Sequence, residues 1–359
     1  MERVLGGLHL KLARALQGLA TTEIALGRHD LRSRCSTVGT RCSQPALGPD
    51  HPDVAFVEIN LATSELALGR YADADARYTR AATSIEAALG TEHPSLVSVF
   101  TNLATARRSM GRLGEARALL ARALAIAESA YGTEHARTAA VINNLAVLEE
   151  LDRRWTEALR LHERALAIRQ RVLPAGHADL ARSLANVALA REETGDVVGA
   201  RAAYEQAIPV LEAALGPDHN DLAQVMSNLA ILLSHQGEHD RAIELHRRAL
   251  AIWERALGPE HPDVALALTA LGKALRAAGQ ASAAVEPLRR AQGIRERPPV
   301  DAVALAETRF ALGEALWDSA GDRDDALALA REALAAYEAA VQRDVAGEIE
   351  GWIAARERL

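Results

Sequence analysis

Histidines return along this chain at a constant spacing of 42 residues, and such a row of imidazoles raises the question of metal chemistry. The row consists of His51, His93, His135, His177, His219 and His261. A zinc ion needs several ligands that converge on one point about 2 Å from each of them. Residues one period apart lie on neighbouring repeats, roughly 10 Å apart if adjacent helices pack at ordinary distances. Each histidine also lies in the loop ahead of an expected helix. We therefore predict cap or loop hydrogen bonds and no metal site.

Motifs for catalysis and for cofactor binding are missing from the sequence. It has no His-Glu-x-x-His zinc motif and no Gly-x-Ser-x-Gly nucleophile elbow, and Gly272 lacks the earlier glycine of a phosphate-binding loop. The acidic pairs at 149–150 and 192–193 are more typical of solvated helix faces than of catalytic dyads. We predict that the protein is not an enzyme and uses no cofactor.

A second landmark keeps the same period and indicates a repeat array. Asn-Leu-Ala occurs at 60–62, 102–104, 144–146 and 228–230, with Asn-Val-Ala at 186–188. In the repeat 93–134, apolar residues at three- and four-residue steps predict a first helix over 96–110 and a second over 113–131. Gly111 and Gly132 are expected to end these two helices. Alanine recurs at two positions of the second helix, represented here by Ala116 and Ala123, where two backbones must come close.

Composition narrows the classes of partner. Apolar residues make up 49% of the 359 residues and aromatic residues only 3%, so the core must consist of Ala, Leu, Val and Ile. A net charge of −7 provides no basic footprint for nucleic acid.

No apolar stretch approaches the roughly 18 residues that span a bilayer, and the first twelve residues lack a signal-peptide pattern. We interpret Cys35 and Cys42 as reduced thiols and predict a soluble cytoplasmic protein without nucleic-acid or membrane partners. The excess of Arg over Lys and the abundance of Ala suggest a GC-rich bacterial genome.

The small residue after Leu in the first helix, the Gly turn and the two alanines of the second helix resemble the tetratricopeptide repeat. The 42-residue period with a Leu-Gly-x-x-His-Pro loop is similar to the kinesin-light-chain-like variety, common in bacterial proteins. This resemblance implies an all-α fold, a right-handed superhelical solenoid of stacked helix-turn-helix repeats. We expect a degenerate repeat or cap over 1–50, six regular repeats over 51–297, a divergent repeat over 298–340 and a capping helix over 341–359.

The resemblance also implies a binding groove, because in tetratricopeptide proteins the first helices line a concave surface. The Asn of the repeated motif contacts bound peptide backbone there, since an amide both donates and accepts hydrogen bonds. The alternative is that this Asn stabilises the packing between repeats, and the two interpretations stay open. The candidate groove residues are Asn60, Asn102, Asn143, Asn144, Asn186, Asn228, Arg108, Glu150, Glu192, Lys273 and Arg276.

Two hypotheses for function follow. The first is a non-catalytic scaffold that binds a peptide or partner protein in the groove. The alternative is a regulatory or sensor module of a bacterial signalling or defence system, with the effector domain on a separate chain. The sequence leaves the partner and the oligomeric state open.

Overall fold

The computed structural model describes residues 52–358. The expected degenerate repeat over 1–50, His51, Cys35 and Cys42 lie outside the described residues. The described part of the chain forms fifteen α-helices. It divides between Leu173 and Pro174 into an N-terminal body and a C-terminal body.

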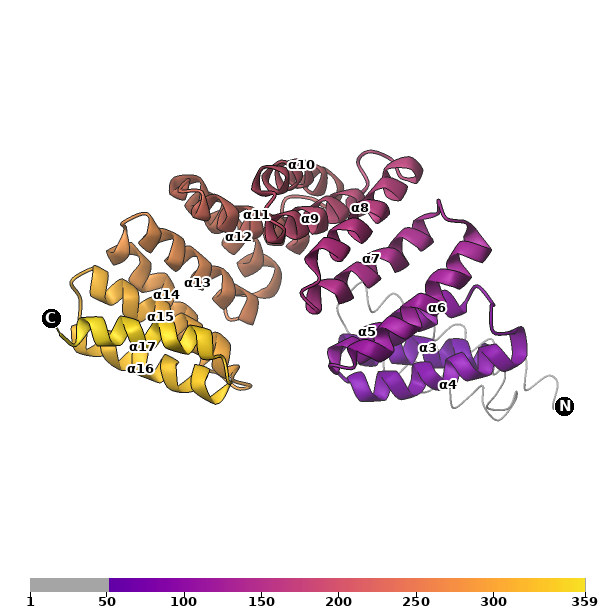
Figure 1. Ribbon diagram of the computed structural model, residues 1–359, viewed down its shortest axis with the longest axis horizontal. Coiled ribbons are helices and arrows are strands. Elements are labelled where there is room, and N and C mark those ends of the chain that lie inside the picture. Colours follow the sequence, from indigo (N-terminus) through magenta and orange to yellow (C-terminus); the bar gives the residue numbers. More distant parts are fainter. Residues whose placement is uncertain (1–51, 359) are drawn as a thin grey trace. The chain divides into compact units, whose positions relative to one another are not determined.

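In the N-terminal body, each first helix packs against the second helix that follows it (Figure 1). The helices are α3 (Pro52–Ala67), α4 (Tyr71–Leu89), α5 (Leu96–Ser109), α6 (Leu113–Tyr131), α7 (Ala136–Leu151) and α8 (Trp155–Val172). The helices α4 and α6 also pack against the first helix of the next repeat, and α5 contacts both α3 and α7. The predicted helices over 96–110 and 113–131 are thus confirmed, the first to within one residue.

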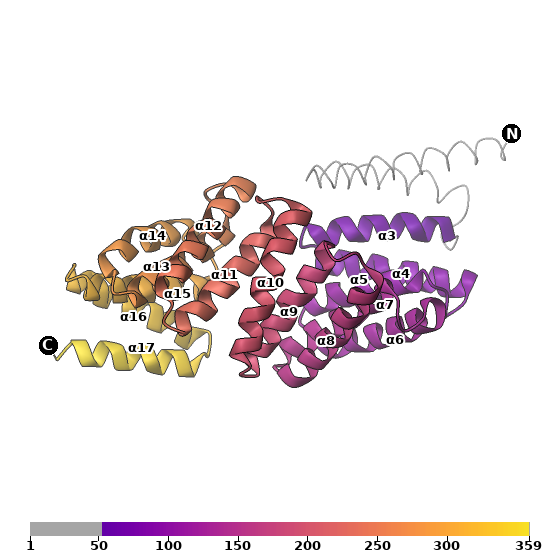
Figure 2. The ribbon, with the colours of Figure 1, turned by 90° about the horizontal axis from the view of Figure 1, so that it is seen from above.

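The C-terminal body continues the same pattern of helix pairs (Figure 2). Its helices are α9 (Ala178–Glu193), α10 (Val197–Leu215), α11 (Asn220–His235), α12 (His239–Leu257), α13 (Pro262–Ala277), α14 (Ala281–Arg295), α15 (Ala302–Asp318), α16 (Arg323–Ala339) and α17 (Arg343–Arg356). The last helix, α17, packs on α16 and buries Ile349 and Ile353 there. The all-α fold of stacked helix-turn-helix repeats is confirmed.

The core of both bodies is built on alanine, as predicted. The two recurring positions of the second helices are buried in every described repeat: Ala74, Ala81, Ala116, Ala123, Ala158, Ala165, Ala200, Ala207, Ala242, Ala249, Ala284 and Ala291. A methyl group is what fits where two helix backbones approach this closely.

The loop histidines cap the first helices, and this confirms the predicted hydrogen bonds. The Nδ1 atoms of His135, His177 and His219 each accept from the backbone N–H two residues ahead, at 3.1 Å. His261 accepts in the same way at 3.2 Å. The imidazole therefore satisfies one of the backbone donors that a helix N-terminus leaves unpaired.

The turn between the two helices of a repeat needs a left-handed backbone. Glycine provides it at Gly69, Gly111, Gly195, Gly237 and Gly279, with φ between 73° and 88°. In the repeat of α7 and α8 the same place holds Arg153, at a φ of 56°. An L side chain in this region costs about 1–2 kcal/mol, because its Cβ crowds the backbone.

We expect Arg153→Gly to raise the free energy of unfolding by about 0.5–1 kcal/mol. The substitution relieves the backbone strain, and the greater chain entropy of glycine in the unfolded state offsets part of this gain. The reciprocal change, Gly111→Arg, should lower it by a similar amount, because a Cβ at Gly111 meets no atom within 4 Å and only the backbone conformation is penalised. Urea unfolding of both variants checks this prediction. A stabilised Gly111→Arg variant would contradict it.

Candidate functional site

The predicted groove positions lie on the first helices, and several of them line cavities. One cavity of about 580 Å³ lies in the N-terminal body and another of about 400 Å³ in the C-terminal body. Both are within the size range of ligand pockets in proteins.

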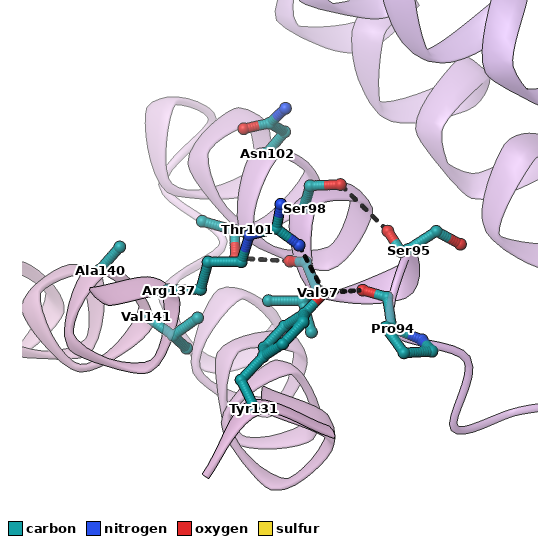
Figure 3. A pocket seen from close by; sticks show the side chains of 10 residues that line it. All are labelled: Pro94, Ser95, Val97, Ser98, Thr101, Asn102, Tyr131, Arg137, Ala140 and Val141. Carbon is teal, nitrogen blue, oxygen red and sulfur yellow. Dashed lines mark hydrogen bonds between the residues drawn. The ribbon is translucent and has the colours of Figure 1, made fainter. Parts of the chain in front are cut away.

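The first cavity lies between α5, the end of α6 and the start of α7 (Figure 3). Its lining comprises Pro94, Ser95, Val97, Ser98, Thr101, Asn102, Tyr131, Arg137, Ala140 and Val141. Arg137 donates from Nη1 to the Tyr131 hydroxyl at 2.7 Å, and its guanidinium lies 4.9 Å from the centre of the Tyr131 ring. The hydroxyl groups of Ser98 and Thr101 donate to backbone carbonyls of their own helix. The cavity thus combines an aromatic wall with a cation.

Asn102 is the predicted groove residue of this cavity. Its side chain is half-buried beside Ser98 and Thr101 and makes no hydrogen bond to another described residue (Figure 3). The equivalent Asn144 on α7 is also half-buried and likewise has no hydrogen-bond partner among the described residues. Both amides are therefore available to a ligand.

The other amides of the row are engaged within the chain. Asn60 and Asn186 both have interactions with other residues. Asn228 accepts a hydrogen bond from Gln224 at 2.9 Å. Asn143 lies 3.1 Å, measured from Oδ1, from Nδ1 of the buried His162. Within the described part of the chain, Asn102 and Asn144 thus differ from the other predicted asparagines in having no hydrogen-bond partner.

The acidic groove residues do not lie on a solvated face as the sequence suggested. Glu149 is only 7% exposed and pairs with Arg117 and Arg154 at 3.1 and 2.5 Å. Glu150 lies 2.8 Å from Nε2 of His162. That prediction was wrong for this pair, because the side chains of Arg117, Arg154 and His162 reach the two carboxylates.

Two further groove residues are half-buried on first helices of different bodies. Burial raises the pKa of the Glu192 carboxyl, which the charge of His235 partly offsets. Arg108 lies on α5, and no ion pair joins it to a described residue.

The second cavity lies beside α11 and α13, which contribute most of its lining. It is lined by Ile231, Ser234, His235, His246, Leu266, Thr269, Ala270, Lys273, Ala274, Arg276, Ala277, Glu307 and Glu314. Lys273 and Arg276, the predicted basic residues, both lie in this wall. His246 comes from the second helix α12 and forms part of the same lining.

The positive charge of Lys273 and Arg276 is balanced by carboxylates of α15. Lys273 Nζ lies 2.5 Å from Glu307, and Arg276 pairs with Glu314 and with Asp318, both at 2.8 Å. Burial raises the pKa of the Glu314 carboxyl, opposed by the charge of Arg276. Glu307 and Glu314 were not among the residues predicted from the sequence. Glu314 follows Leu312-Gly313 at the same distance at which Lys273 follows Leu271-Gly272, so the register signal was present.

Tyr131, Arg137 and His246 were also missed, because they lie outside the register positions taken from the family. Among the residues from 52 to 358, no group of His, Cys, Asp and Glu side chains could hold a metal ion. None of the helices in that range is both long and apolar enough to cross a bilayer.

Among known protein families, the family described as "Tetratricopeptide repeat" matches this chain over residues 53–129, 95–171, 137–213, 179–252 and 221–297. These overlapping windows cover more than half of the chain, and no catalytic domain was found with them. No curated protein matches the sequence.

Solved structures include kinesin-light-chain-like relatives. The Q17M variant of a Podosopora anserina kinesin light chain with nearly identical TPR-like repeats is 28% identical, with a TM-score of 0.50 over 56% of this chain and 96% of that one. BtubC (BKLC) from P. vanneervenii is 25% identical, with a TM-score of 0.55 over 64% of this chain and 91% of that one.

A third similar structure is the signal-transduction ATPase with numerous domains and a tetratricopeptide repeat sensor from Pyrococcus horikoshii. It is 15% identical, with a TM-score of 0.64, and the match covers 96% of this chain but 54% of the ATPase. At this identity the likeness shows the shared fold alone, so it does not favour a sensor module over a scaffold.

Proposed function

Because the chain belongs to the tetratricopeptide repeat family, whose repeats are generally protein-interaction modules, we propose that it is a non-catalytic scaffold that binds a peptide or partner protein along its first helices. The observation that carries this proposal is the cavity beside Asn102, where an amide without a described partner faces a volume of about 580 Å³. The kinesin-light-chain-like relatives at 25% and 28% identity support the same class of function.

The arrangement of the first cavity fits an extended peptide. An amide that both donates and accepts pairs with a peptide backbone whatever its side chains are. Asn102 and Asn144 repeat this group at the same place on successive first helices, α5 and α7. Tyr131 and Arg137 add an aromatic face and a guanidinium, the residue types that contribute most at protein interfaces.

We expect the double variant Asn102→Ala with Asn144→Ala to bind its partner about tenfold more weakly, because each lost amide hydrogen bond contributes about 0.5–1.5 kcal/mol. The measurement is affinity capture from the native host with quantified recovery, followed by titration of the purified partner. The matched control is Gln170→Ala with Gln206→Ala, which removes two exposed amides from the second helices α8 and α10.

Both double variants should keep the wild-type helical content. A partner whose affinity falls equally in both variants, or in the control alone, would contradict binding along the first helices. A partner lost only from the Asn102 and Asn144 variant would support it and provide the ligand for structural work.

A further inference from the structure

Two buried histidines occupy the same place in repeats that are two periods apart, and only one of them is satisfied. His162 on α8 and His246 on α12 are 0% and 1% exposed. Both ring nitrogens of His162 have partners in their own repeat, Asn143 at Nδ1 and Glu150 at Nε2. The Nδ1 atom of His246 is buried without a hydrogen-bond partner among the described residues.

The reason lies in two substitutions on the facing first helix. The places of Asn143 and Glu150 are taken, 84 residues later, by Ser227 and Ser234 on α11. A serine hydroxyl reaches a shorter distance than a carboxamide or a carboxylate, so the imidazole of His246 loses the acceptors that His162 has. A buried polar group left unpaired is costly, and native proteins rarely keep one without a role.

The space that a longer side chain at position 234 would fill belongs to the second cavity. Ser234 and His246 both line the second cavity of about 400 Å³. Its aliphatic rim includes Ile231 and Leu266, which are 39% and 45% exposed. The chain therefore has a pocket with an aliphatic rim and the His246 ring in its wall. The short hydroxyl group of Ser234 stands there in the place from which Glu150 bonds the ring of His162.

We infer that this pocket binds a carboxamide side chain, that of a glutamine or asparagine flanked by aliphatic residues in the bound peptide. The carboxamide would take the place beside His246 that the side chain of Glu150 takes beside His162. This inference rests on the proposed function, because most of the pocket wall belongs to first helices, and it names the side chain that the partner supplies.

The charges around the pocket favour a neutral group over a carboxylate. Lys273 and Arg276 are already paired with Glu307, Glu314 and Asp318. A further anion would add a fourth carboxylate to a cluster with three permanent cations, Lys273, Arg276 and Arg295, the last of which lies 3.7 Å from Glu307. A carboxamide adds no charge, and it donates and accepts like a neutral imidazole.

The test uses three probe peptides that differ in one residue: acetyl-Leu-Gln-Leu-amide, acetyl-Leu-Glu-Leu-amide and acetyl-Leu-Ala-Leu-amide. Each is titrated into the full chain near pH 7 while the imidazole resonance of His246 is followed by NMR, assigned by its loss in His246→Leu. We expect the glutamine peptide to shift this resonance with a Kd of about 1 mM, and the other two to bind at least about tenfold more weakly.

A plugged variant provides the second arm. Ser234→Gln places a carboxamide of the chain itself next to His246, so it should move the resonance without any peptide and weaken the glutamine peptide at least about tenfold. The control is Ser109→Gln, an exposed serine at the end of α5 that lines neither cavity. It should leave binding unchanged.

Tighter binding of the glutamate or alanine peptide would overturn the inference, and so would no shift by any peptide up to about 10 mM. Unchanged glutamine binding in Ser234→Gln would overturn it as well. Because the probes need no natural partner, these outcomes are independent of the Asn102 and Asn144 capture experiment, which tests the proposed function itself.

Discussion

Lowering the pH from about 7 to about 5 is expected to destabilise the wild-type protein by about 2 kcal/mol more than a His246→Leu variant. Burial lowers the pKa of His246 to about 4, against an ordinary value of 6.5. Between these two values the unfolded chain binds a proton that the folded chain excludes. Stability is therefore complete above pH 6.5 and is lost as the pH falls toward 4.

Leucine is a suitable reference at this position because two other repeats use it. Leu120 and Leu288 occupy the place of His246 in α6 and α14, and both are buried. His246→Leu removes the titrating group while keeping an aliphatic side chain that the fold accepts. The raised pKa of Glu192 and of Glu314, which act in the opposite direction, remains in both proteins and cancels in the difference.

The measurement is urea unfolding at several pH values, followed by tryptophan fluorescence, to which the buried Trp253 on the same helix as His246 contributes. The free energy of unfolding of each protein is expressed relative to its own value at neutral pH. Below pH 6.5 this relative value should fall further for the wild type than for His246→Leu. Parallel curves for the two proteins would show that His246 titrates alike in the folded and unfolded chain, and would contradict its isolation from water and partners.

The repeating features could be predicted from the sequence because they depend on local pattern alone. Helix bounds follow from apolar spacing, the turn from a glycine with positive φ, and the buried alanines from their constant place seven residues apart. Even the histidine caps follow from position, since a side chain just ahead of a helix has few other donors to meet. Each of these features is set within one repeat and is copied along the chain.

The features that distinguish one repeat from another could not be predicted from the sequence in the same way. The pocket beside His246 is lined by Ser234 where an earlier repeat has Glu150, and a sequence pattern does not display a missing acceptor. The charge of Lys273 and Arg276 is balanced by Glu307 and Glu314, which follow the loop where the 42-residue register breaks. Arg153 adopts a conformation that its residue type disfavours, because the turn is fixed by the helices on both sides.

Replacing one of the recurring buried alanines of the second helices with a larger side chain is the second change with a large expected effect. Ala123 on α6 is fully buried in a core that includes Phe100 and Leu103 of α5. We expect Ala123→Leu to lower the free energy of unfolding by about 1–3 kcal/mol, because three added carbon atoms must displace packed neighbours or separate the helices.

The matched control is Ala121→Leu, on the same helix two residues earlier, where the side chain is exposed. This control makes the same chemical change, and its effect on helix propensity is no more favourable than that of the core variant. It should therefore alter the free energy of unfolding by less than about 0.5 kcal/mol. Thermal and urea unfolding of both variants separate the effect of packing at Ala123 from the effect of the Ala-to-Leu change itself. Equal melting temperatures for the two would contradict the placement of Ala123 between α5 and α6. A loss confined to Ala123→Leu would show that the close approach of the two helices limits this position to a methyl group, and that the recurrence of alanine there is a steric requirement of the stack.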